Sequence, residues 1–187
     1  MGETQRSNNI GKTTRSNTMG KTGGSNMSEF EVHIPYLKRC VELSLLAREA
    51  GNTPFGSLLV GPTGEILLEH GNVEITESNC TGHAETMLME VASKRYSKEE
   101  LWACTLYTST EPCAMCAGAI YWGNVGRVVF GMSEAMLIVL TGDSEQNPTL
   151  ALPCREVFAR GNKPIEVIGP VPEVLNAAIA AHSGYWK

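Results

Sequence analysis

Two short segments of the chain carry side chains that suit a metal ion and proton transfer. His83 and Glu85 stand two residues apart, and Cys113 and Cys116 follow Pro112 in a Pro-Cys-x-x-Cys pattern. An imidazole and two thiols are ligands that zinc prefers, and the carboxylate of Glu85 is left over. A structural zinc has four protein ligands, whereas a catalytic zinc keeps one position for water. Three ligands and a spare carboxylate therefore favour a catalytic zinc site.

Helices are expected to hold both segments. Apolar residues at helical spacing predict one helix from about 82 to 96 and another from Cys113 to about 121. Cysteines at i and i+3 share one face of a first helical turn, and the positive end of the helix dipole favours the thiolate that binds metal. Zinc lowers the pKa of a bound water to about 7, and Glu85 could take the proton of this water and pass it to a substrate.

Cys-x-x-Cys alone is also typical of a structural zinc half-site or of a redox pair. A structural zinc would need a fourth ligand, for which the candidates are Cys80, Cys104 and His70. A redox pair would leave the His-x-Glu segment unexplained. The order and spacing of the two segments resemble the cytidine-deaminase-like superfamily of zinc deaminases. Within it, the chain is most similar to the branch that holds guanine deaminase, cytosine deaminase and tRNA adenosine deaminase.

The resemblance covers residues from about 30 to the C-terminus and implies both fold and chemistry. The fold class would be α/β, a three-layer α/β/α sandwich around a five-stranded mixed sheet. One Zn2+ per chain would be held by His83, Cys113 and Cys116, and Glu85 would be the catalytic residue of a hydrolysis that releases ammonia. The family also commonly forms homodimers, for which residues 122–125 are a candidate surface.

The same resemblance suggests where a substrate would be held. Asn72 closes a predicted strand where related enzymes use an asparagine to bind the base, although it could equally cap a turn. Trp122 belongs to an aromatic pair similar to that of guanine deaminases, and it could equally be a core residue. Asp143 lies where guanine and guanosine deaminases carry an aspartate that reads an amine, and its alternative is an exposed loop position. The predicted substrate contacts are Asn72, Phe55, Ala84 through its backbone N–H, Asp143, Trp122 and Tyr185 in the aromatic C-terminus.

The charge distribution bears on the substrate. Residues 1–27 carry four Lys/Arg and one Glu, so the rest of the chain, with 11 basic and 19 acidic residues, has a net charge of −8. Phosphate contacts supply much of the affinity for nucleic acids, so an acidic body argues against a tRNA or DNA substrate. We therefore expect a free nucleobase or small nucleoside, with a guanine-like purine preferred and cytosine possible. The alternatives are a tRNA adenosine deaminase and a non-catalytic zinc protein.

The remaining chain is consistent with one domain and a reduced, cytoplasmic location. Residues 1–27 are polar and repetitive and are expected to be a disordered, artificially added leader, with a deaminase domain over 28–187. Six dispersed cysteines do not form a disulfide framework, and the longest apolar run, Ala135–Leu140, is too short to cross a membrane. No element is assigned to residues 133–149. Further helices are expected at 35–50, 150–160 and 172–181, and strands at 55–60, 65–72, 103–109, 127–131 and 165–168.

Overall fold

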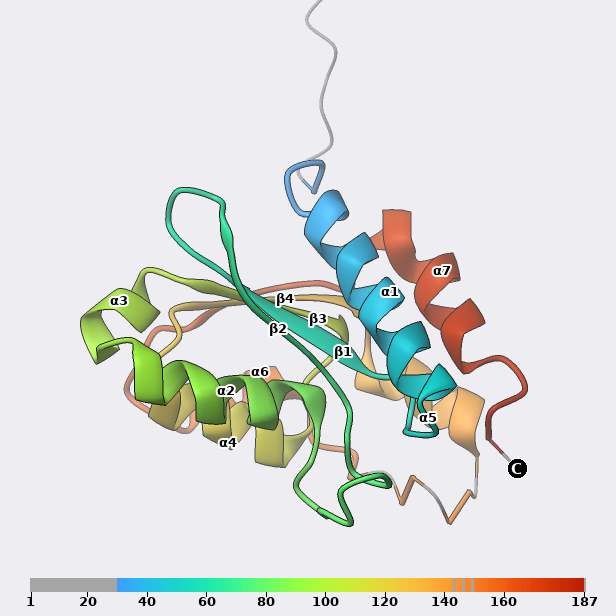
Figure 1. The fold of residues 1–187 in the computed structure, drawn as a ribbon. Coiled ribbons are helices and arrows are strands. Elements are labelled where there is room, and N and C mark those ends of the chain that lie inside the picture. The colour runs from blue at the N-terminus through green and yellow to red at the C-terminus, as the bar shows by residue number, and fades with distance from the viewer. Residues whose placement is uncertain (1–29, 143, 146, 149, 187) are drawn as a thin grey trace, which may run out of the picture.

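A five-stranded mixed sheet forms the middle layer of the fold (Figure 1). The computed structural model describes residues 30–142, 144–145, 147–148 and 150–186. The strands lie in the order β2-β1-β3-β4-β5; β1 is antiparallel to β2 and β3, whereas β3, β4 and β5 are parallel. This confirms the predicted mixed sheet. The strands are β1 (Gly56–Val60), β2 (Ile66–Gly71), β3 (Thr105–Thr110), β4 (Arg127–Met132) and β5 (Glu166–Ile168).

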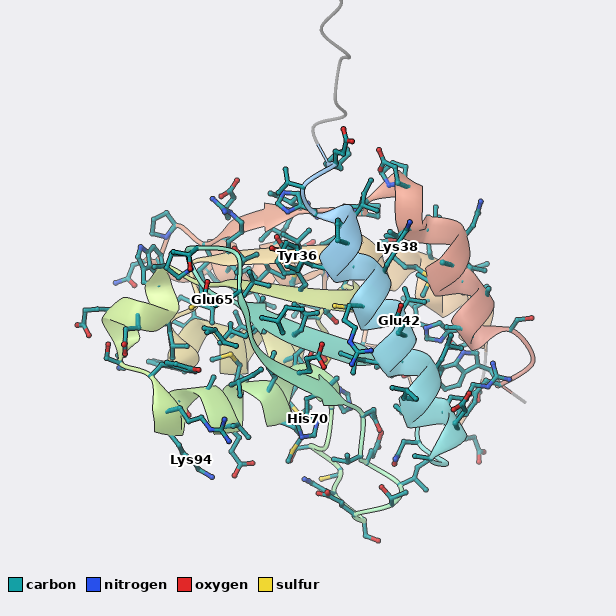
Figure 2. The ribbon with its side chains drawn as sticks, turned by 45° about the horizontal axis from the view of Figure 1, so that its top comes forward. Tyr36, Lys38, Glu42, Glu65, His70 and Lys94 are labelled. Atoms are coloured by element: carbon teal, nitrogen blue, oxygen red, sulfur yellow. The ribbon has the colours of Figure 1, made fainter. Side chains whose placement is uncertain are left out.

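Helices cover both faces of this sheet, which confirms the predicted three-layer architecture. Helices α1 and α7 pack side by side on one face, and α2, α4 and α6 cover the other (Figure 1). Charged side chains stand on the outer surfaces of two of these helices, with Lys38 and Glu42 on α1 and Lys94 on α2 (Figure 2). The helices are α1 (Ile34–Glu49), α2 (Ala84–Arg95), α3 (Lys98–Trp102), α4 (Ala114–Gly123), α5 (Glu134–Thr141), α6 (Cys154–Ala159) and α7 (Pro172–His182).

Buried apolar side chains fill the space between the layers. One cluster, which includes Leu88, Ile120 and Phe130, lies between the sheet and the helices α2, α4 and α6. On the other face, α1 approaches β1 so closely that a β-carbon at Gly56 would lie 2.5 Å from the carbonyl oxygen of Cys40. Only glycine fits such an approach. None of the described helices has the length and apolar character needed to cross a bilayer.

Three helices differ from the expectations. Helix α3 was not predicted, although Ser97 and Glu100 form a capping box that the sequence pattern contains. Helix α5 occupies part of the segment left unassigned, and Ser133 accepts a hydrogen bond from the Met136 N–H at its start. Helix α6 begins at Cys154 rather than at residue 150, because a residue that precedes proline disfavours helical geometry and Pro153 stands directly before the helix.

The topology brings several strand ends to one edge of the sheet. Since β3 and β4 are parallel neighbours, with Thr110 opposite Met132, the segments that follow them begin side by side. Strand β1 runs the other way, so its start lies at the same edge, where the Gly56 N–H donates to Ser109 Oγ at 3.2 Å. Strand β2 ends there too, because Gly71 pairs with Gly56. This edge holds the candidate site.

Candidate metal centre and adjoining pocket

The three predicted ligands meet at the beginnings of two neighbouring helices. His83 is the N-cap residue of α2, Cys113 is the N-cap residue of α4, and Cys116 lies in the first turn of α4. His83 Nδ1 is 3.6 Å from each of the two sulfur atoms, and all three ligand atoms lie within 4.8 Å of one another. Tetrahedral zinc with ordinary Zn–N and Zn–S bonds would separate such ligands by about 3.6 Å. The residues therefore fit a zinc ion.

Electrostatics at these ligands favour a cation. A hydrogen bond from Cys116, supported by one from His83, lowers the pKa of Cys113 to about 4, and the same pairing raises the pKa of Cys116. The hydrogen bond with Cys113 also raises the pKa of His83 to about 9. Glu74 Oε2 lies 3.9 Å from His83 Nε2, on the side of the ring away from the sulfurs. Carboxylates commonly orient metal-binding histidines in this way.

A fourth protein ligand is not found among the described residues. Cys80 is exposed, and Cys104 donates its thiol to the Glu100 carbonyl at 3.2 Å. His70 Nδ1 lies 2.6 Å from the Gly71 carbonyl oxygen. The metal-ligating cluster of the described chain therefore contains one histidine and two cysteines, the set expected for a site that leaves a coordination position for water.

Glu85 lies beside the ligands without belonging to their cluster. Its side chain is only 5% exposed, Oε1 accepts a hydrogen bond from the Thr108 hydroxyl at 2.8 Å, and Oε2 is 3.5 Å from the Cys116 sulfur. Burial raises the pKa of Glu85 above its usual value. A raised pKa brings a carboxyl group closer to the range in which general acids and bases work.

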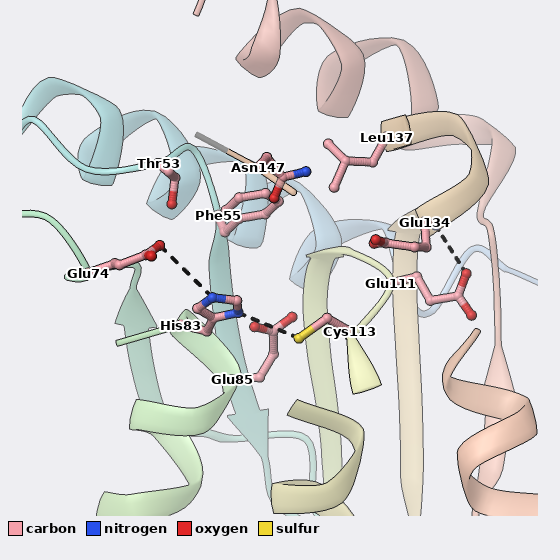
Figure 3. A pocket seen from close by; sticks show the side chains of 10 residues that line it. All are labelled: Thr53, Phe55, Glu74, His83, Glu85, Glu111, Cys113, Glu134, Leu137 and Asn147. Atoms are coloured by element: carbon pink, nitrogen blue, oxygen red, sulfur yellow. Dashed lines mark hydrogen bonds and ion pairs between the residues drawn. The ribbon is translucent and has the colours of Figure 1, made fainter. Parts of the chain in front are cut away.

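A pocket opens next to the metal ligands (Figure 3). Phe55 and Leu137 provide apolar surface, and four of the lining residues are glutamates; none of the ten is Lys or Arg. The lining of the pocket is thus rich in carboxyl groups and without Lys or Arg. The lining residues are Thr53, Phe55, Glu74, His83, Glu85, Glu111, Cys113, Glu134, Leu137 and Asn147.

Glu111 fixes the relative positions of three segments at this edge. It is buried directly after β3; Oε2 accepts the Glu134 N–H at 3.1 Å, and Oε1 accepts the N–H of Cys154 at 3.2 Å. The Cys154 thiol donates to the same Oε1 at 3.3 Å. A single carboxylate therefore ties the starts of α5 and α6 to the strand that leads to Cys113.

The C-terminal residues 182–186, called the C-terminal clasp below, support the pocket from behind. The Phe55 ring lies 5.2 Å from the ring of His182 and 6.2 Å from that of Trp186, centroid to centroid. Trp186 Nε1–H donates to His182 Nδ1 at 3.2 Å. Arg48 donates to the carbonyl oxygens of Ala181 and Ser183, and its guanidinium lies over the Tyr185 ring. These contacts hold Phe55, a wall of the pocket, from within the same chain.

The predicted substrate contacts occupy different places. Phe55 lines the pocket, and Asn72 is buried next to it with Oδ1 accepting the Glu74 N–H at 2.9 Å and Nδ2 without a partner among the described residues. Ala84 is fully buried in the first turn of α2. Asp143 lies outside the described residues.

Two other predicted contacts are not brought to the pocket. Tyr185 packs against Arg48 and Trp186 and is not among the residues that line it. Trp122 lies near the end of α4 opposite to Cys113 and is 74% exposed. The sequence could not show that Trp122 lies away from the pocket, because Trp122 closely follows Cys116 in the chain. In the structure, the ten-residue helix α4 separates the aromatic pair from the metal ligands at its start.

Several pocket residues were not predicted from the sequence. Glu74 follows β2 in a loop, Glu134 opens α5, and Asn147 comes from the segment after α5. The Ser133-Glu134 pair was an available signal, since serine followed by an acidic residue is typical of a helix start. Thr53, Glu111 and Leu137 complete the set that sequence reasoning did not identify.

Comparison with known proteins agrees with this geometry. The family model for the cytidine and deoxycytidylate deaminase zinc-binding region matches residues 31–132, which contain all three metal ligands and Glu85. A probable cytosine deaminase from Schizosaccharomyces pombe is 39% identical over 156 residues, which cover 83% of this chain and 93% of that protein.

Two bacterial relatives match over shorter spans. A tRNA-specific adenosine deaminase from Bacillus subtilis is 38% identical over 96 residues, which cover 51% of this chain and 59% of that protein. The solved structure of a guanine deaminase from Bacillus subtilis aligns with a TM-score of 0.52 at 32% identity, and it covers 65% of this chain and 82% of that one.

Proposed function

We propose that this chain, which belongs to the cytidine and deoxycytidylate deaminase family, removes the amino group of a free nucleobase by hydrolysis and releases ammonia. Family membership and the three-ligand site make it a zinc-dependent deaminase. The observation that carries the substrate proposal is the pocket beside the metal ligands, which has apolar surface from Phe55 and Leu137 and carries four glutamates but no Lys or Arg.

The charge of this pocket supports an uncharged substrate. Glu74, Glu85, Glu111 and Glu134 line it, and only His83 among the ten lining residues can carry a positive charge. A phosphate group entering this space would be repelled, whereas nucleic-acid sites normally offer Lys or Arg to phosphates. A nucleotide or tRNA substrate is therefore the weaker alternative, and a neutral base is favoured.

Cytosine is the first candidate among the bases. The fission yeast relative, named a probable cytosine deaminase, matches over almost its whole length. Guanine is the second candidate, because the guanine deaminase of Bacillus subtilis matches in both sequence and structure. The features that favoured guanine in the sequence carry less weight, since Trp122 lies away from the pocket and Asp143 is outside the described residues.

The chain's own residues would position the base and move protons. His83, Cys113 and Cys116 would hold the zinc ion, which when bound would supply a water molecule of lowered pKa. Glu85 would take the two protons of the attacking water one after the other, giving the first to the ring nitrogen and the second to the amine that leaves as ammonia, and the Thr108 hydroxyl holds its carboxylate in place. Because Glu85 is buried next to the ligands, the proton travels a short path away from bulk water.

Other residues would bind and orient the ring. The Asn72 Nδ2 group, buried without a partner among the described residues, is available to donate to a carbonyl oxygen or ring nitrogen of the base. Phe55 offers an aromatic surface for stacking, and the Ala84 N–H at the start of α2 is a further donor. These contacts would place the amine near the metal ligands and Glu85.

A homodimer is proposed as the working form. Trp122 lines a shallow groove with Met89 and Ala119 between α2 and α4, and an exposed tryptophan is typical of protein interfaces. Val125, expected to share this surface, is instead fully buried. A Trp122→Glu variant should sediment as a monomer if this face joins two copies, whereas an unchanged mass would place the interface elsewhere.

Ammonia release from the zinc-loaded protein tests the proposed function. The substrates are cytosine, guanine, adenine, isocytosine, the nucleosides cytidine, guanosine and adenosine, and a tRNA anticodon stem-loop. We expect turnover of a free base, with the stem-loop unchanged. Turnover of the stem-loop alone would support the tRNA alternative and contradict the substrate proposal, while leaving the deaminase chemistry in place.

A further inference from the structure

Glu134 presents a buried carboxylate to the pocket on the wall formed by the junction of β4 and α5. The residue is 6% exposed, and its side chain points into the pocket from the wall that faces Glu74 and His83 (Figure 3). The Glu134 N–H donates to Glu111 Oε2 at 3.1 Å, which anchors the backbone from which this side chain extends.

This carboxylate differs from the other three in the pocket. Glu85 accepts a hydrogen bond from Thr108, Glu111 accepts bonds from two segments, and Glu74 faces His83. No hydrogen bond to the Glu134 carboxylate is present among the described residues, and burial raises its pKa to about 7. The Glu134 oxygens are not among the fully enclosed unpaired atoms of the described residues; they are open to the pocket and can accept a hydrogen bond from a bound substrate.

Two nearby polar groups also lack partners within the described chain. Asn147 Nδ2 and Thr53 Oγ1 are buried at the pocket, and neither makes a hydrogen bond there. The pocket thus presents an acceptor on Glu134 together with donors from Asn147 and Thr53. Such a set matches a neutral heterocycle that carries an N–H next to acceptor atoms.

The candidate bases offer few N–H groups that could donate a hydrogen bond to the Glu134 carboxylate. In cytosine the amine leaves the ring carbon between N3 and C5, and the only other N–H is at N1. In guanine one ring N–H adjoins the reacting carbon, so the imidazole N–H is the one remote from it. In both bases the remote N–H is at the nitrogen that carries the sugar in the nucleoside. Glu134 extends from the α5 wall of the pocket rather than from α2, which carries Glu85 (Figure 3), so this remote N–H is the donor that we assign to it.

We propose that Glu134 accepts the ring N–H at the glycosylation position of the base and so makes the pocket selective for the free base over the nucleoside. This inference rests on the proposed function, because it concerns how that substrate is bound. A nucleoside or N-methylated base has no hydrogen at this nitrogen and would leave the Glu134 acceptor unpaired. Sites built to bond such a hydrogen reject analogues that lack it by factors of 10⁴ or more at the upper end.

The test compares two substrates, the free base and its N-methylated form, in wild type and in Glu134 variants. The kcat/KM values for cytosine and 1-methylcytosine are measured with zinc-loaded wild type and Glu134→Ala; guanine and 9-methylguanine replace them if guanine is the base turned over. We expect the wild type to prefer the free base by at least about 100-fold. Glu134→Ala should reduce this preference to within about 10-fold, with Glu134→Gln between the two. The matched control is Glu99→Gln, an exposed carboxylate on α3, which should behave as wild type.

A binding measurement separates recognition from turnover. In a Glu85→Gln background, calorimetry should show that Glu134→Ala weakens binding of the free base while binding of the methylated base changes little. Zinc content and circular dichroism establish that the variants are folded. A preference that stays the same in Glu134→Ala, with both substrates losing activity equally, overturns the inference. Wild-type protein that deaminates no free base would instead overturn the proposed function, and this inference with it.

Discussion

The metal centre and the opposite wall of the pocket are assembled in contrasting ways. All three metal ligands and Glu85 come from two segments of no more than four residues each, both at helix starts. The rest of the pocket is built from a loop before β1, a loop after β2, the start of α5 and the segment after α5, and the C-terminal clasp packs behind Phe55. Chemistry is therefore encoded locally, and substrate selection is distributed along the chain.

The difference suggests which part of the molecule varies between relatives. The family model ends at residue 132, before α5, so it covers the metal centre and only part of the wall. Relatives whose printed names give different substrates match this chain. Changes in the metal centre should thus abolish activity, whereas changes in the wall should alter substrate affinity and selectivity.

The largest effect is expected from removal of a metal ligand. Cys116→Ala should retain well under one zinc per chain by elemental analysis and lose measurable ammonia release. Metal bound only by the folded state stabilises it by about 4 kcal/mol at 1,000 times its dissociation constant, so the melting temperature should fall as well. The exposed Cys80→Ala is the control and should retain zinc. Full zinc content in Cys116→Ala would contradict the ligand assignment.

The C-terminal clasp should respond to pH in a way that the metal centre does not explain. Burial, aided by Arg48, lowers the pKa of His182 from 6.5 to about 4. The unfolded chain therefore takes up this proton at higher pH than the folded protein does. The His182 contribution to stability is present above about pH 6.5 and decreases as the pH falls towards 4, by about 3 kcal/mol in all.

A His182→Phe variant isolates this contribution. Urea unfolding of wild type and variant between pH 7 and 4.5 gives the difference in the free energy of unfolding, which cancels the opposite effect of buried carboxyls such as Glu134. The stability of the wild type should decline more steeply as the pH falls. Parallel pH profiles would show that His182 titrates alike in the folded and unfolded states.

A smaller effect is expected at the residue that links the two regions. Glu74 lines the pocket and also lies 3.9 Å from His83 Nε2. Since this separation exceeds a hydrogen bond, Glu74→Gln should weaken zinc binding by about 10-fold, the lower end for such partners. Competition with a chelator measures this, with the exposed Glu77→Gln as the control. Unchanged zinc affinity would assign Glu74 to the pocket wall alone.

The smallest effect is expected from removing a side chain that supports Phe55 in the pocket wall. Trp186→Ala removes an aromatic neighbour of Phe55. Without this neighbour, Phe55 has to be ordered when the base binds, and the cost of this ordering weakens binding. The KM for the base should therefore rise by about 3- to 10-fold, while kcat and zinc content stay near wild type. Trp102→Ala, on the distant α3, serves as the matched control. A fall in kcat without a change in KM would instead place the C-terminal clasp in the chemical step.

The same contrast explains what the sequence could predict. The metal centre was predictable because His83, Glu85 and the cysteine pair lie within short motifs, and the strand and helix periodicities placed them correctly. The wall was not, because Glu134, Asn147 and Thr53 become neighbours only when parallel and antiparallel strands end at one edge. For Trp122 the prediction was wrong: it was expected to contact the substrate because it is near the cysteines in sequence, but it lies away from the pocket.

The role of Glu85 as a proton carrier that does not bind the metal is the central claim, and Glu85→Gln tests it most directly. Zinc content and ammonia release from the base are measured on the same preparation of this variant and wild type. The account predicts unchanged zinc content, an unchanged fold and a loss of kcat of about 10³-fold or more, within the range for acid–base groups. Substantial remaining turnover, or loss of zinc with the carboxylate, would contradict it.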